Sequence, residues 1–154
     1  MTSVPSIDQE VGVPQGSSEG GLTWLVIFDI LLTMLHIDQA SDFYIEDNDG
    51  QLHPQMPTAF ADDLLTYAST HAMQQRQASI TSFFCMMTGL ELKPSKMVAR
   101  AINVSASDAQ LHPLLSLTLI DGTTSTIPID YSAEGVHGDA MRYLGIYIDI
   151  ENTW

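Results

Sequence analysis

Two adjacent carboxylates, Asp62 and Asp63, lie between two apolar stretches in the segment TAFADDLLTY, residues 58–67. Neighbouring side chains of a regular strand point to opposite faces, so both carboxylates can reach one ligand only where the strand bends. Two such close carboxylates stay ionised together at neutral pH when a cation neutralises them, and Mg²⁺ is a hard cation that takes oxygen ligands. The pair is therefore a candidate magnesium site at a hairpin turn. Taken alone, an Asp-Asp pair more often forms an exposed turn in which both charges simply face water, so the metal site depends on the neighbouring motifs.

The flanking segments predict the elements that must position this pair. TAF and LLTY, on either side of the aspartates, are expected to form two short strands. Residues 22–36 are apolar on nearly all sides, which predicts a buried core helix. A second helix is expected from Ser69 or Thr70 to Thr88, because Ser and Thr cap helix starts and Gly89 stands where a C-terminal glycine belongs.

The rest of the chain predicts mainly strands. Residues 43–45, Phe-Tyr-Ile, form a strand candidate that runs into an Asp-Asn-Asp-Gly turn at 47–50. Four later runs are rich in β-branched and aromatic residues and are separated by Gly, Pro, Asp and Ser. They are KMVARAINV, LLSLTLI, TSTIPI and YLGIYIDI. The order of helix, hairpin, helix and strands predicts an α+β fold after an irregular N-terminal segment at 1–10.

The charge balance limits the partners that this chain can bind alone. Its 154 residues contain 5 Lys and Arg against 19 Asp and Glu, a net charge of -14. Nucleic-acid affinity comes mainly from cations that displace counterions, so we expect weak binding of DNA or RNA. High solubility is the simpler consequence of the acidity. No apolar run reaches the roughly 18 residues of a membrane span, no secretory signal precedes one, and Cys85 is the single cysteine. These features predict an intracellular protein, nuclear or cytoplasmic, without disulfides and without a membrane partner.

Two further metal motifs fail on spacing. In a calcium loop with Gly50 as the sixth position, Ile45 would be the first and Met56 the twelfth, where carboxylates are required. The five histidines show no zinc-ligand spacing with Cys85. The Asp-Asp pair is therefore the remaining metal candidate.

Residues 60–63, FADD, resemble the aromatic-x-Asp-Asp signature of reverse transcriptases, and three other segments occur in the order that this family shows. Residues 12–16, GVPQG, are similar to the glycine-x-proline-glutamine-glycine turn that precedes a long helix. Residues 89–96, GLELKPSK, resemble the glycine-leucine turn that ends in a lysine, and residues 142–145, RYLG, resemble the primer-grip strand. The resemblance covers 11–151 and implies the palm subdomain of an RNA-directed DNA polymerase, closest in style to non-long-terminal-repeat retrotransposons.

The resemblance implies a palm-like antiparallel sheet packed on two helices, with template-primer and deoxynucleotide triphosphate as partners and Mg²⁺ as cofactor. Asp62 would bind both catalytic metal ions, and Asp63 would support it. Phe60 would pack beneath the turn and help set its angle. Gln15 and Gly16 would lie beside the nascent base pair, with glycine allowing close backbone approach.

The remaining implied roles concern the leaving group and the primer. Lys96 matches the lysine that family members place near the pyrophosphate, where a cation stabilises developing negative charge. Tyr143, Leu144 and Gly145 would hold the primer end. Taken singly, Tyr143 and Leu144 fit ordinary strand core better, and Lys96 fits a solvated turn better; only the joint pattern of the four segments favours the family roles.

The sequence also departs from the family pattern. The family places a first metal-binding aspartate on a strand well upstream of the glutamine-glycine turn, whereas here Asp8 is the only aspartate before that turn and lies four residues from Gly12. The fingers, which supply cations for the triphosphate, are also missing. We therefore expect this chain to be inactive by itself. An acidic protein-interaction domain that keeps a palm fold without polymerase activity is the alternative.

Overall fold

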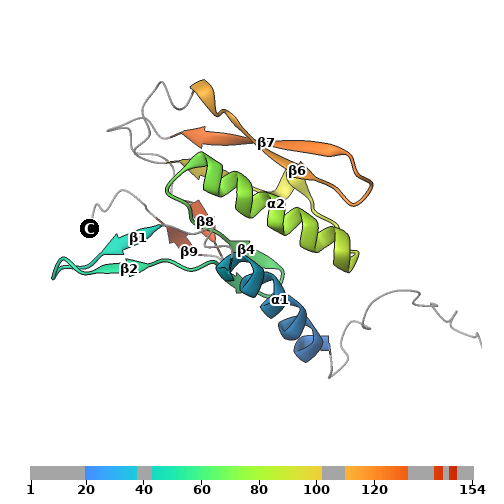
Figure 1. The fold of residues 1–154 in the computed structure, drawn as a ribbon, viewed down its shortest axis with the longest axis horizontal. Coiled ribbons are helices and arrows are strands. Elements are labelled where there is room, and N and C mark those ends of the chain that lie inside the picture. Colours follow the sequence, from blue (N-terminus) through green and yellow to red (C-terminus); the bar gives the residue numbers. More distant parts are fainter. Residues whose placement is uncertain (1–19, 38–42, 102–109, 132–140, 144–145, 149–154) are drawn as a thin grey trace, which may run out of the picture.

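The fold is α+β, as predicted, and it is built in layers. The computed structural model describes residues 20–37, 43–101, 110–131, 141–143 and 146–148. Helix α2 (His71–Thr88) is the central element: α1 (Gly20–Ile37) contacts one side of it and strand β6 (Leu114–Thr118) contacts another. Figure 1 shows the short hairpins of the N-terminal half on the α1 side of α2, and β6 with β7 (Thr124–Tyr131) on the opposite side.

The described strands form four separate sheets and not the single antiparallel sheet that the sequence suggested. Three are antiparallel pairs: β1 (Tyr44–Glu46) with β2 (Leu52–Pro54), β3 (Thr58–Phe60) with β4 (Asp63–Leu65), and β8 (Met141–Tyr143) with β9 (Ile146–Ile148). The fourth has the order β5-β7-β6, and β5 (Ala99–Ala101) pairs with β7 in parallel. α2 carries the chain from β4 to the far layer before β5 begins, so the β3–β4 hairpin stays apart from the three-stranded sheet.

Both ends of α2 lie where the sequence placed them. Thr70 has an extended backbone, and its side chain accepts a hydrogen bond from the backbone N of Met73 at 3.2 Å. Gly89 has a φ of 74°, the left-handed conformation that ends helices and that glycine adopts without steric cost. These local signals fix where the helix starts after the Asp-Asp hairpin and where the segment that leads to Lys96 begins.

Side chains of α2 also cover the free edge of β6. The amide of Gln75 donates to the backbone O of Ser116 at 2.8 Å and accepts from its N at 2.9 Å. Nε2 of His71 lies 3.0 Å from the O of Leu114, and the N of Thr118 donates to Ser82 Oγ at 3.2 Å. Because unpaired backbone groups on a strand edge invite pairing with other chains, this helix protects the edge.

Two small apolar cores lie on opposite sides of α2. Between α1 and α2 the buried residues are Leu31, Leu35, Phe84 and Cys85. Between α2 and the sheet they are Leu115, Leu117 and Ile127. Leu92, from the loop after α2, contacts both cores and so joins the two layers.

The helix predicted over residues 22–36 is present as α1, but it is not buried in the core as the sequence suggested. Only Leu31 and Leu35 are buried, while most of its other large apolar side chains are half-buried or exposed. The 18 residues of α1 have a mean hydropathy of 1.8, and 17% of them are buried. By length and composition α1 is therefore apolar enough to span a membrane. Counted alone, the continuous apolar runs of the sequence did not predict such a segment. Among the described elements, α1 contacts mainly α2 and, to a smaller extent, β3.

Candidate functional site: an Asp-Asp hairpin held by helix α1

The two aspartates lie at a hairpin bend, as predicted. β3 and β4 pair with the register Phe60↔Asp63, which leaves Ala61 and Asp62 as a two-residue tip. Ala61 has a φ of 52°, the left-handed region that costs a non-glycine residue of order 1–2 kcal/mol. Such strain persists only where neighbouring contacts impose it, and strained positions concentrate at functional sites.

The register assigns each side chain of the hairpin to a face. Ala59 pairs with Leu64, and Leu64 packs against the core between α1 and α2, so this pair faces the helices. Phe60 and Asp63 therefore share the opposite face. Phe60 is 65% exposed, and the expectation that it packs beneath the turn is wrong, because the alternation of the strand gives that inward position to Ala59.

A hydrogen bond from α1 holds the turn. The indole Nε1 of Trp24 donates to the backbone O of Ala61 at 2.6 Å, and the Trp24 ring lies 4.7 Å from that of Phe28, centroid to centroid. In the segment that follows β4, the backbone O of Tyr67 accepts a hydrogen bond from the amide of Gln77 in α2 at 2.6 Å. The tip of the hairpin is thus tied to α1, and the segment after the hairpin is tied to α2.

The sequence on the N-terminal side of the pair carries acidic side chains but no Lys or Arg. The first Lys or Arg of the chain is Arg76, and eleven Asp and Glu precede it. Asp62 and Asp63 are both exposed. Among the described residues no group of three or more His, Cys, Asp or Glu side chains is arranged to hold a metal ion. A divalent ion at this turn would therefore rest on two carboxylates and on ligands from outside the described residues.

The predicted lysine lies on a different element. Leu90 and Leu92 of the 89–96 segment are partly buried against the core, which fixes the path of this loop. The loop ends in a 3-10 turn, η1 (Pro94–Lys96), which contacts β7, and Lys96 is exposed at its end. Within the described residues Lys96 forms no ion pair with Asp62 or Asp63. The structure thus does not bring the lysine and the aspartates into direct contact.

Of the other predicted site residues, only Tyr143 lies within the described part of the chain. Gln15, Gly16, Leu144 and Gly145 lie outside the described residues. Tyr143 is the last residue of β8, and its backbone pairs with Ile146 of β9, so an antiparallel pair of strands stands where the sequence suggested one strand beginning at Tyr143. The segment 1–10 also lies outside the described part of the chain.

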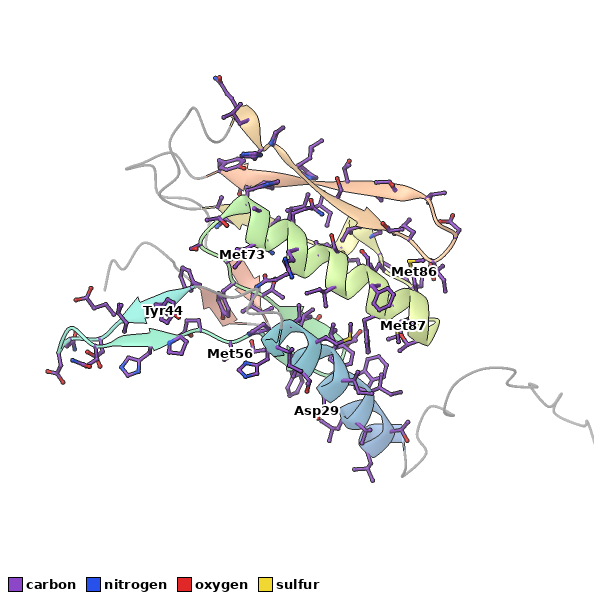
Figure 2. All side chains as sticks on the ribbon, viewed as in Figure 1. Asp29, Tyr44, Met56, Met73, Met86 and Met87 are labelled. Carbon is purple, nitrogen blue, oxygen red and sulfur yellow. The ribbon has the colours of Figure 1, made fainter. Side chains whose placement is uncertain are left out.

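Behind the hairpin lies a groove that the sequence did not reveal. Its volume is about 320 Å³, and α1 and β3 form its walls. The lining residues are Gly21, Trp24, Leu25, Phe28, Asp29, Leu32, Ala59 and Ala61. Figure 2 shows Asp29 on the side of α1 away from α2. A carboxylate in the middle of an otherwise apolar helix was the available signal, but helical periodicity alone does not say which face it occupies.

A second acidic turn, between β1 and β2, is a contrasting case. Asp47 accepts hydrogen bonds from the backbone N of Asp49 at 2.9 Å and of Gln51 at 2.8 Å, and its other oxygen lies 2.7 Å from Nε2 of His53. The hydrogen bond with His53 and those with the backbone lower the pKa of Asp47. The oxygens of Asp47 are therefore engaged within the turn.

Comparison of the chain with protein-family models, with curated proteins and with solved structures found no match.

Proposed function

We propose that this chain is part of the palm of an RNA-directed DNA polymerase, in which the β3–β4 hairpin presents Asp62 and Asp63 to Mg²⁺. The observation that carries the proposal is the bend itself: two adjacent acids stand at a strained two-residue tip between short strands, tied to a helix by the bond from Trp24 to Ala61. The bond from Trp24 ties this turn to α1 and so helps to position the backbone that carries the two acids.

The donor set suits a hard cation. Carboxylate oxygens are the preferred ligands of Mg²⁺, which usually keeps several waters and binds through one or two carboxylates together with substrate phosphates. When bound, Mg²⁺ would favour deprotonation of a primer 3′-hydroxyl and would reduce the repulsion between the triphosphate and the two carboxylates. Asp62 at the tip is the principal ligand in this proposal, and Asp63 is the supporting one.

The chain's own residues have positioning roles in this proposal. Trp24 holds the turn through the carbonyl of Ala61. Gln15 and Gly16 lie beside the nascent base pair, Lys96 near the leaving group, and Tyr143, Leu144 and Gly145 against the primer. The parallel and antiparallel pairs of the three-stranded sheet support a mixed α+β scaffold, and the palm assignment rests on the order of the four sequence motifs.

Primer extension tests the function directly. The chain is assayed with Mg²⁺ on an RNA template with a DNA primer, alone and mixed with a separate polypeptide that carries the fingers and first palm strand of a retrotransposon polymerase. We expect extension only in the mixture, reduced at least a hundredfold by Asp62→Asn and unchanged by Asp49→Asn, which removes an equal charge from the other acidic turn. Extension that survives Asp62→Asn would refute the proposal, and no extension in any mixture would favour the non-catalytic interaction domain.

A further inference from the structure

Among the described residues, helix α1 has an exposed apolar face. Its exposed large side chains form one ridge, because they lie about one turn apart from Leu22 to Ile30 and two turns apart from Ile30 to Ile37. They are Leu22 at 68%, Leu25 at 67%, Val26 at 59%, Ile30 at 51% and Ile37 at 74% exposed. The groove of about 320 Å³ between α1 and β3 adjoins this ridge through Leu25. Contiguous apolar surface of this kind marks an interaction site more often than scattered single residues do.

The nature of the surface indicates the kind of partner. The backbone hydrogen bonds of α1 are closed within the helix, so the ridge offers side chains and not a strand edge. A partner segment must therefore satisfy its own backbone groups, and a helix does this while its ridges fit into the grooves of another helix. The pocket at Trp24, Phe28 and Ala59 offers space for one bulky apolar side chain of that helix.

Charge selects among the possible occupants. Asp29 lines the groove and, within the described residues, has no hydrogen-bond or ion-pair partner. Covering a carboxylate costs free energy unless a cation pairs with it. Asp29 also lies in the middle of the 18-residue α1, so a symmetric antiparallel contact with a second copy would place two Asp29 side chains together. The absence of any Lys or Arg among residues 1–75 likewise disfavours an anionic membrane surface.

We propose that the ridge of α1, with the adjoining groove, is a docking site for an amphipathic helix of another protein that places Lys or Arg opposite Asp29. The inference does not depend on the polymerase proposal, because the ridge and the groove include neither Asp62 nor Asp63. Docking would nevertheless hold the Trp24 side chain in place and, through its hydrogen bond to Ala61, would stabilise the turn that carries Asp62.

A model peptide tests the docking site. A fluorescent 18-residue helical peptide with leucines on one face and lysines on the other is titrated with the chain, and a peptide with glutamate in place of lysine serves as control. We expect the lysine peptide to bind and the glutamate peptide not to bind. Ile30→Glu should weaken binding of the lysine peptide at least tenfold. Ile120→Glu should change the affinity for this peptide less than twofold, because Ile120 is as exposed as Ile30, at 51%, but lies away from α1 in the β6–β7 turn.

Two substitutions that each remove one negative charge separate docking from general attraction to an acidic chain. Asp29→Asn should weaken binding of the lysine peptide severalfold more than Asp49→Asn does. Equal effects of the two substitutions, or tighter binding of Ile30→Glu, would show attraction to net charge alone and overturn the proposal. Dimerisation of the chain that Ile30→Glu abolishes, seen by sedimentation, would assign the ridge to a second copy instead. Binding to phosphatidylcholine vesicles that Ile30→Glu abolishes would assign it to a membrane.

Discussion

The bond from Trp24 to Ala61 predicts that a change in α1 will loosen the Asp-Asp hairpin. Trp24→Phe keeps an aromatic ring beside Phe28 but removes the N–H that donates to the Ala61 carbonyl at 2.6 Å. A net hydrogen bond contributes about 0.5–1.5 kcal/mol, and since Ala61 is exposed its carbonyl regains water, so we expect about 0.5–1 kcal/mol. That corresponds to a two- to fivefold change, roughly, in the local opening equilibrium.

Amide hydrogen exchange measures this opening residue by residue. In Trp24→Phe the amides of β3 and β4 should exchange about two- to fivefold faster, while those of β6 and β7 should keep their rates. The melting temperature should fall by only about 1–4 °C for a chain of this size. Trp24→Ala, which also removes ring packing, should cost about 2–3 kcal/mol, somewhat less than for a fully buried ring. Unchanged exchange in the hairpin of Trp24→Phe, or equal acceleration throughout the molecule, would refute the coupling.

Three further predictions follow from local geometry. Ala61→Gly should leave the free energy of unfolding equal or raise it by up to about 1 kcal/mol in urea titrations, whereas Ala61→Val should lower it by more than 1 kcal/mol, since a β-branched residue tolerates a left-handed φ poorly. Thr70→Ala should cost about 1 kcal/mol through loss of the helix cap, and Thr70→Ser should restore most of it. Hydrogen bonding with His53 lowers the pKa of Asp47 below its ordinary value of 3.8, so this contribution to stability is present above about pH 4 and is lost as the pH falls through the lowered pKa. An NMR titration of His53→Ala should therefore show the Asp47 pKa moving up toward 3.8.

Elements defined by local chemistry could be predicted from the sequence. Thr70 and Gly89 specify the ends of α2 because a hydroxyl cap and a left-handed glycine act within one turn of the helix. The Asp-Asp bend was likewise predictable, since short apolar runs on both sides leave the acids as the turn. In each case the deciding interactions lie within a few residues of one another.

Features that depend on distant contacts could not be predicted in this way. The apolar composition of α1 suggested burial, but burial depends on what covers each face, and periodicity cannot supply the partner. The parallel pairing of Ala99 with Ile129 joins residues thirty positions apart and leaves no local pattern. Phe60 was expected beneath the turn only because the resemblance implies it, whereas the register of β3 with β4 gives the inward position to Ala59. The bond from Trp24 to Ala61 spans 37 residues and was also invisible to local analysis.

Whether adjacent acids at this bend bind divalent cations can be measured by paramagnetic broadening. Substoichiometric Mn²⁺ is added to isotopically labelled protein, and the backbone amide signals are followed. We expect Asp62, Asp63 and their immediate neighbours to broaden first, and Asp62→Asn to abolish the effect without altering the signals of the turn at 47–50. Equal broadening of both acidic turns, or broadening of the hairpin that persists in Asp62→Asn, would contradict a metal site at residues 62 and 63.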